Sequence, residues 1–215
     1  MKVKVVTRIL EANERIAAEN RRIFDEAGVY VINLMSAPGA GKTSLLERTI
    51  KELNGKVKIA VIEGDIAGSE DAERIGSLGV PVIQINTGGA CHLDANMINE
   101  VLGELPLKEV DLLFVENVGN LVCPAEFNVG EDMKMMVLSI TEGDDKPLKY
   151  PLMFQESSAL ILNKIDLLPH TNTNMDKIKK DAASLNSSIK IFEVSCSTGK
   201  GIPEWADWIV KKVKS

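Results

Sequence analysis

The sequence predicts an α/β protein in which helices cover both faces of a mostly parallel, seven-stranded sheet. Short β-rich runs alternate with helical runs along the chain, an order that is typical of parallel sheets. Several helical runs also carry terminal signals: Gly28 and the Asn54-Gly55 pair end two of them, and Pro203 lies in the first turn of the last. A chain of 215 residues commonly forms one such domain.

The expected elements follow from these runs. Strands are predicted over residues 29–35, 57–63, 80–85, 111–116, 134–141, 159–163 and 189–194. Helices are predicted over residues 8–27, 43–53, 69–78, 93–105, 175–185 and 203–213. The stretches 117–133 and 142–158 are irregular, and we expect loops there.

The first helix is amphipathic, because its apolar residues recur near helical spacing between glutamates and arginines. Two roles are open for it: it can lie along the edge of the core, or it can contact a partner or a second copy of the chain. We expect residues 1–28 to form an N-terminal helix packed on the core and residues 29–215 to form the main domain, within one structural unit.

Composition predicts a soluble protein of the cytoplasm. Hydrophobic residues make up 45% of the chain, charged residues make up 26%, and no run approaches the ~18 apolar residues of a membrane span. The net charge of −6 argues against a nucleic-acid surface. The first residues lack the apolar core and cleavage site of a secretory signal, so the three cysteines are better suited to metal than to disulfides. We expect neither nucleic acid nor membrane among its partners.

The most specific motif is Ser-Ala-Pro-Gly-Ala-Gly-Lys-Thr, at residues 36–43 between an apolar run and a helical run. A strand, a glycine-rich turn and a helix N-terminus gather backbone N–H groups and a helix dipole around one phosphate. Lys42 adds a mobile charge and the Thr43 hydroxyl can bind Mg²⁺, although Ser36 replaces the usual first glycine. We therefore expect a three-layer P-loop NTPase, whose nucleotide contacts Ala37, Pro38, Gly39, Ala40, Gly41, Lys42, Thr43 and Ser44.

A second motif, Asn-Lys-Ile-Asp at residues 163–166, follows the sixth predicted strand and indicates the base. The Asp166 carboxylate can accept hydrogen bonds from N1 and the exocyclic amine of guanine, whereas adenine offers no such donor pair. The Asn163 amide can bind the other base edge and hold nearby loops, and the stem of Lys164 can lie against the purine. Ser195 and Cys196 resemble the usual Ser-Ala-Lys loop, whose backbone donors face guanine O6. Residues 29–215 are thus predicted to be a GTPase domain that binds GTP and GDP.

Carboxylates at two strand ends are candidates for magnesium binding and hydrolysis. Glu116 and Gly119 belong to Glu-Asn-Val-Gly, in the place of the usual Asp-x-x-Gly. The carboxylate of Glu116 can hold Mg²⁺ through water, and the N–H of Gly119 can meet the γ-phosphate. Asp65 is a second candidate and Asp71 a weaker one, although both could instead cap a helix.

From these positions we expect Lys42, Asp65, Glu116 and Gly119 to act in hydrolysis, with Thr43, Asp65 and Glu116 around Mg²⁺. Intrinsic hydrolysis should be slow, because no glutamine or arginine finger is assignable from the sequence.

Three further residues suit a soft or borderline metal. Cys91 and His92 precede a predicted helix, and Cys123 follows the Glu-Asn-Val-Gly motif. Two thiolates and an imidazole suit Zn²⁺ or Ni²⁺, and water, a second chain or a transferred ion must complete the coordination. The alternative is that the cysteines are buried and His92 caps the helix. Cys196 is expected to be a packing residue, and His170 an exposed loop residue.

Taken together, five segments closely resemble the HypB family, the nickel-incorporation GTPases of [NiFe]-hydrogenase maturation. They are Ser-Ala-Pro-Gly-Ala-Gly-Lys-Thr at 36, Glu-Gly-Asp at 63, Thr-Gly-Gly-Ala-Cys-His-Leu-Asp-Ala at 87, Glu-Asn-Val-Gly-Asn-Leu-Val-Cys-Pro at 116 and Asn-Lys-Ile-Asp-Leu-Leu-Pro at 163. The resemblance implies that Cys91, His92 and Cys123 hold Ni²⁺ or Zn²⁺ at a GTP-promoted homodimer interface. It also implies two partners, a HypA-type nickel-binding protein and the hydrogenase large-subunit precursor.

The expected function is therefore that of a GTP-hydrolysing metallochaperone, in which GTP favours a dimer that positions the metal and hydrolysis releases it. Some family members carry an N-terminal Cys-x-x-Cys-Gly-Cys motif or a histidine-rich tract, whereas residues 1–28 contain no Cys or His, so we expect transfer rather than storage. Two alternatives are open. One is a urease accessory GTPase, which normally shows Cys-Pro-His where this chain has Ala-Cys-His, and the other is a GTP switch whose interface zinc is purely structural.

Overall fold

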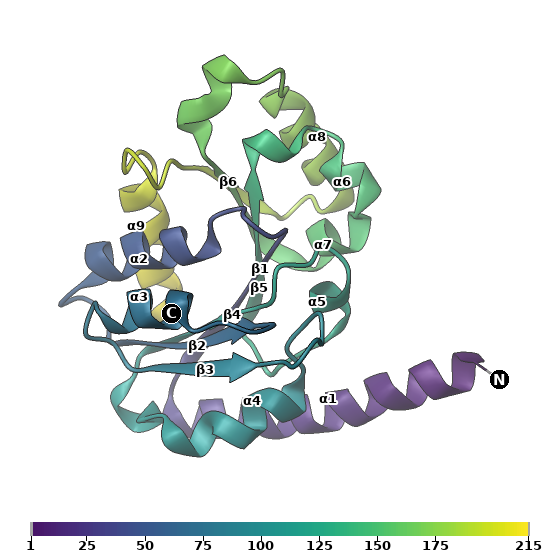
Figure 1. Cartoon of the computed structure of the whole chain (residues 1–215), viewed down its shortest axis with the longest axis vertical. Helices are drawn as coiled ribbons and strands as arrows, with labels where there is room; N and C mark the ends of the chain where they lie inside the picture. Colours follow the sequence, from purple (N-terminus) through teal and green to yellow (C-terminus); the bar gives the residue numbers. More distant parts are fainter. Residues whose placement is uncertain (1, 215) are drawn as a thin grey trace.

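The computed structural model describes residues 2–214, with side chains from Leu10 onward, and it contains a seven-stranded sheet in the order β3-β2-β4-β1-β5-β6-β7 (Figure 1). Every neighbouring pair of these strands is parallel. The strands are β1 (Tyr30–Ser36), β2 (Ile59–Asp65), β3 (Val82–Asn86), β4 (Leu112–Glu116), β5 (Met133–Ser139), β6 (Ser157–Asn163) and β7 (Lys190–Glu193). The prediction of an α/β fold with a parallel sheet is confirmed.

Helices lie on both faces of the sheet (Figure 1). The α-helices are α1 (Lys2–Ala27), α2 (Lys42–Leu53), α3 (Glu70–Gly76), α4 (Ala95–Val101), α5 (Cys123–Glu126), α6 (Lys146–Lys149), α7 (Pro151–Glu156), α8 (Met175–Leu185) and α9 (Ile202–Val213). Short 3₁₀ turns add η1 (Leu102–Glu104), η2 (Leu107–Glu109), η3 (Ile140–Glu142) and η4 (Ile165–His170). Among the described residues, no helix is both long and apolar enough to cross a bilayer.

The alternation of side chains along β1 explains why both sheet faces are covered. Ile32 and Leu34 pack on one face in a cluster that includes residues of α2, α3 and α9. Val31 points to the opposite face, toward α1 and α4, and Met35 points there too, toward α5, α7 and α8. A strand that is apolar on both faces must be buried on both, so the helices form two outer layers.

Three predictions of loop and helix extent were wrong. The stretch 142–158 was expected to be a loop, but it contains α6 and α7 and the start of β6. Pro147 and Pro151 lie in the first turns of these helices, where a proline is tolerated, and Met153 and Phe154 are fully buried. The predicted helix 93–105 is divided into α4 and the 3₁₀ turn η1. The loop expected over 117–133 contains the short helix α5.

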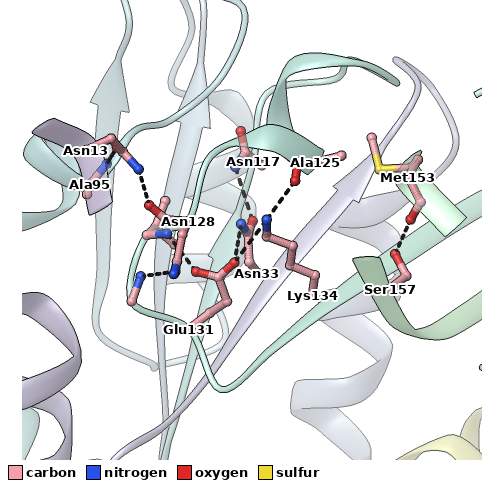
Figure 2. A network of polar contacts seen from close by, with 12 residues as sticks. Asn13, Asn33, Ala95, Asn117, Ala125, Asn128, Glu131, Lys134, Met153 and Ser157 are labelled. Atoms are coloured by element: carbon pink, nitrogen blue, oxygen red, sulfur yellow. Dashed lines mark hydrogen bonds and ion pairs between the residues drawn. The ribbon is translucent and has the colours of Figure 1, made fainter. Parts of the chain in front are cut away.

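Two buried asparagines fasten α1 to the rest of the molecule. Asn13 accepts a hydrogen bond from the Ala95 N–H (2.9 Å) and donates one to the Asn128 carbonyl (2.8 Å), as Figure 2 shows. Asn20 donates to the carbonyls of Ala95 (2.8 Å) and Val129 (3.2 Å). The described part of α1 therefore lies along the core and joins the start of α4 to the loop that follows α5.

Candidate functional site

The candidate site lies at the carboxyl edge of the sheet, where the order of strands reverses around β1. Loops after β1, β2, β4 and β6 meet there, as expected for ligand sites of open parallel sheets. A cavity of about 460 Å³ is lined by the phosphate loop and by carboxylates from β2 and β4. A neighbouring cavity of about 590 Å³ is lined by the expected base-binding residues Asn163, Asp166 and Cys196. Gly41, Ser44 and Lys164 line both cavities.

The phosphate loop has the backbone that its glycines require. Gly39 and Gly41 have φ angles of 73° and 99°, in the region that favours glycine. A Cβ on Gly41 would lie 2.5 Å from Nδ2 of Asn163, so a larger residue is excluded. Ser36 is the last residue of β1 and does not have positive φ, so this position needs no glycine. Its Oγ accepts a hydrogen bond from Nζ of Lys42 (3.1 Å).

A carboxylate cluster lies below the phosphate loop. The Thr43 hydroxyl donates to Oε1 of Glu116 (2.9 Å), and oxygens of Glu63, Asp71 and Glu116 lie within 4.8 Å of one another. Burial raises the pKa of Glu63 and of Glu116 to about 7. The second oxygens of both side chains are buried without a hydrogen-bond partner. Buried carboxylate oxygens beside a threonine hydroxyl fit a divalent cation such as Mg²⁺.

Asp65 and Arg74 line the same cavity. Oδ1 of Asp65 accepts the Ile66 N–H (2.6 Å), and Asp65 is not part of the tight cluster. The guanidinium of Arg74 binds Asp71 (2.7 Å) and Glu47 (2.8 Å). Sequence reasoning assigned no arginine to the site, because Arg74 reaches the cavity from α3 and belongs to no phosphate-binding motif.

Glu63 was also missed, although it belongs to the quoted Glu-Gly-Asp segment. The parallel register of β2 and β4 pairs Glu63 with Glu116. Glu63 and Asp65 are two residues apart on β2, so their side chains share one face of the sheet. Alternation could therefore have linked Glu63 to Asp65, but only the sheet register places it beside Glu116.

Hydrogen bonds within the chain hold the candidate base-binding loops together. Nδ2 of Asn163 donates to the Ala40 carbonyl (2.9 Å), and Nζ of Lys164 donates to the Gly39 carbonyl (2.7 Å). The Ser195 hydroxyl donates to Oδ1 of Asp166 (2.6 Å), which lowers the pKa of that carboxyl. An ionised Asp166 is the form that accepts two hydrogen bonds from guanine.

Cys196 lies between the base cavity and the core. It is half-buried against the apolar cluster of α2 and α9, and burial raises the pKa of its thiol to about 11. Its N–H points at Oδ1 of Asn163 (3.4 Å). A protonated, packed thiol is a poor metal ligand, in line with the packing role expected for it. His170 is exposed at the end of η4.

Cys91, His92 and Cys123 converge although they come from two separate loops. The two Sγ atoms lie 3.2 Å apart, and Sγ of Cys91 lies 3.8 Å from Nδ1 of His92. One ligand atom from each of the three residues lies within 4.8 Å of the other two. The geometry therefore suits a single metal ion with two sulfurs and one nitrogen.

The surroundings of this trio favour ligation over the alternative roles. Cys91 is exposed rather than buried, and Asp94 rather than His92 caps α4, through the Met97 N–H (2.9 Å). Burial lowers the pKa of His92, whose ring lies 4.0 Å from that of Phe127, so the imidazole is neutral and free to ligate. Burial raises the pKa of the Cys123 thiol, so its proton would have to leave as a metal binds.

The sheet, the phosphate loop and the threonine–carboxylate pair define a P-loop NTPase with a cluster of soft ligands beside its nucleotide cavity. A family model described as CobW/HypB/UreG, nucleotide-binding domain, matches residues 30–193. The hydrogenase maturation factor HypB of Azotobacter vinelandii is 50% identical over 95% of this chain and 67% of its own length.

Two solved structures agree with this match. HypB from Archaeoglobus fulgidus is 39% identical and superposes with a TM-score of 0.89, over 94% of this chain and 99% of that one. HypB from Helicobacter pylori in complex with nickel is also 39% identical, with a TM-score of 0.89 over 94% and 95% of the two chains. The chain belongs to the HypB family of hydrogenase maturation factors, which confirms the resemblance seen in the sequence.

Proposed function

We propose that this protein is a GTP-hydrolysing metallochaperone that delivers nickel during [NiFe]-hydrogenase maturation. The observation that carries the proposal is the convergence of Cys91, His92 and Cys123 next to the loop that would sense the γ-phosphate. The solved nickel complex of a Helicobacter pylori relative supports nickel as the cargo. Nickel is here the substrate that is passed on, whereas GTP supplies the timing.

The nucleotide half of the proposal assigns GTP and Mg²⁺ to the two neighbouring cavities. Asp166 would accept hydrogen bonds from guanine, and Lys42 would contact the terminal phosphates. Thr43 and Glu116 would hold Mg²⁺ with Asp65 nearby, and the Gly119 N–H would meet the γ-phosphate. This division of roles leads to hydrolysis to GDP and phosphate, with the loop around Gly119 ordered only while the γ-phosphate is present.

The metal half of the proposal requires a second chain. Three protein ligands leave a four-coordinate ion incomplete, and a two-fold axis at Cys91 would bring six ligands together. Two exposed apolar side chains support a dimer contact on the surface around Cys91. Val122 is 51% exposed next to Cys123, and Ile66 is 51% exposed at the nucleotide cavity. We infer a homodimer that forms with GTP and separates after hydrolysis.

The partners proposed for the handoff are a HypA-type nickel-binding protein and the hydrogenase large-subunit precursor. A reducing compartment such as the cytoplasm would keep both thiols available for metal. The same ligands suit Zn²⁺, so a GTP switch with a structural zinc is the competing function. In that case nickel would not leave on hydrolysis.

Ligand replacement with measurement of oligomeric mass tests the proposal. The native chain, Cys91→Ala and Cys123→Ala are titrated with nickel, while light scattering records their mass in GDP and in a non-hydrolysable GTP analogue. Both variants should lose tight nickel binding, and Cys196→Ala, the matched control, should keep it. Tight binding that survives both substitutions would show that the metal site lies elsewhere. A monomer in both nucleotide states would refute the dimer.

A further inference from the structure

We propose that Asn120 is a positioning residue that sets the spacing of the two metal-binding thiols and ties this spacing to the phosphate loop. The inference rests on the proposed function and deepens it, because it names the side chain through which the nucleotide site acts on the metal site.

The contacts of Asn120 reach three segments of the site. Its backbone N–H donates to the carbonyl of Ser36, at the start of the phosphate loop (2.8 Å). Its side-chain Nδ2 donates to the carbonyl of Cys91 (3.1 Å), and its Oδ1 accepts the N–H of Val122 (2.9 Å). Since Cys123 directly follows Val122, one amide group joins the backbones that carry the two thiols.

A second asparagine, Asn117, binds the Cys91–His92 segment at its C-terminal end, through Leu93. Oδ1 of Asn117 accepts the N–H of Leu93 (2.9 Å). Its Nδ2 donates to Oδ1 of Asn33 on β1 (3.1 Å), as Figure 2 shows. The backbone N–H of Asn117 also binds β1, at the Leu34 carbonyl (2.9 Å). Asn117 is fully buried and bound to the sheet, so we take it as the fixed attachment of the Cys91–His92 segment.

Asn120 lies at the other end of this segment, next to the residue that would contact the γ-phosphate. Gly119 precedes it and lies so close to the phosphate loop that an added Cβ would stand 2.9 Å from the backbone N and Cα of Pro38. A γ-phosphate that draws in the Gly119 N–H would therefore shift Asn120 as well. Because the Asn120 side chain binds both the Cys91 carbonyl and the Val122 N–H, the shift would displace both groups together. The thiol spacing, 3.2 Å in this structure, would then differ between nucleotide states.

Three variants separate this role from a general effect on stability. Asn120→Ala removes both side-chain hydrogen bonds. Asn120→Asp keeps the acceptor for Val122 and removes the donor to Cys91. Asn128→Ala is the matched control, because Asn128 Oδ1 accepts the N–H two residues ahead, from Gly130 (2.9 Å), whereas its Nδ2 faces Glu14 rather than the Cys91 carbonyl. Thermal unfolding midpoints establish that each variant is folded.

The experiment measures nickel affinity in GDP and in a non-hydrolysable GTP analogue, together with the thiolate-to-nickel charge-transfer band. The native chain and Asn128→Ala should show a nucleotide effect of about tenfold, within the usual range of coupling between sites. Asn120→Ala and Asn120→Asp should reduce it to about twofold or less and shift the band, since both lose the hydrogen bond to Cys91.

The outcomes distinguish the inference from the proposed function. An undiminished nucleotide effect in Asn120→Ala would overturn the inference while leaving the gated handoff intact. Equal nickel affinities of the native chain in the two nucleotides would instead refute the nucleotide-gated handoff. In that case the charge-transfer band alone tests whether Asn120 sets the thiol spacing. An unchanged band in Asn120→Ala would show that Asn120 does not set the thiol spacing, whereas a shifted band would support it.

Discussion

The base-binding region and the metal-binding region lie at the same edge of the sheet, but they differ in how complete they are. Asn163, Lys164 and Asp166 each make a hydrogen bond within the chain, and these bonds hold their loops in place. Cys91 is exposed, and within the described part of the chain the candidate metal cluster consists of three ligands, Cys91, His92 and Cys123. The difference teaches that one chain can build the proposed nucleotide site, whereas the proposed metal site would need a further ligand from outside the chain, and this need is what would allow it to be switched.

The largest effect should come from the complete region. Asp166→Asn turns the acceptor of two guanine donors into a group with an N–H on one side, so GTP affinity should fall about 1,000-fold, as for the loss of two charge-assisted hydrogen bonds. Xanthosine triphosphate, which has an oxygen in place of the exocyclic amine, should bind better to the variant than GTP does. Competition binding measures both. An unchanged preference for guanine would mean that Asp166 does not read the base.

The carboxylates between the two regions should give a smaller effect, on stability. Burial raises the pKa of Glu116 from 4.5 to about 7, so its contribution to folding is fully present below pH 4.5 and is lost as the pH rises through about 7. In the nucleotide-free protein, Glu116→Gln should remove roughly 3 kcal/mol of this decline, while its amide oxygen can still accept the Thr43 hydroxyl.

Urea unfolding of both forms between pH 4.5 and 8 checks this prediction. Parallel curves for the native chain and Glu116→Gln would contradict it. A bound magnesium ion with GDP would offset the negative charges of Glu63 and Glu116 in the native chain. It should therefore bring the stability curves of the native chain and Glu116→Gln closer together.

The smallest effect, on dimer affinity, should come from a surface residue beside the metal-binding region. Val122→Glu would place a charge beside Cys123 on each copy of the proposed two-fold interface, so the proposed GTP-bound dimer should weaken about tenfold, by about 1.4 kcal/mol. Leu148→Glu is the control, because Leu148 is 59% exposed on α6 and lies outside the site. Sedimentation in the GTP analogue compares the two. Equal weakening, or none in either variant, would place the interface elsewhere.

The same contrast explains what the sequence could predict. The phosphate loop and the Asn163–Asp166 motif are contiguous, and each follows a strand, so local spacing was sufficient to identify them. The carboxylate pair of Glu63 and Glu116 depends on the register of β2 and β4, which no local pattern encodes. Asn120 looked like an ordinary loop residue, because the role proposed for it depends on a contact with Cys91, 29 residues away in the chain.

Helix prediction failed for a related reason. Pro147 and Pro151 suggested a loop over 142–158, but Met153 and Phe154 are buried against β5 and β6, and this tertiary packing stabilises helices too short to form alone.

The central claim is that the nucleotide controls the hold on the metal, and nickel affinity of the native chain tests it most directly. Competitive titration against a chromophoric chelator, in saturating GDP and then in a saturating non-hydrolysable GTP analogue, gives the two dissociation constants. The account predicts that they differ by about tenfold or more, since a ligand can shift an equilibrium only through its differential affinity. Equal constants in the two nucleotides would contradict it.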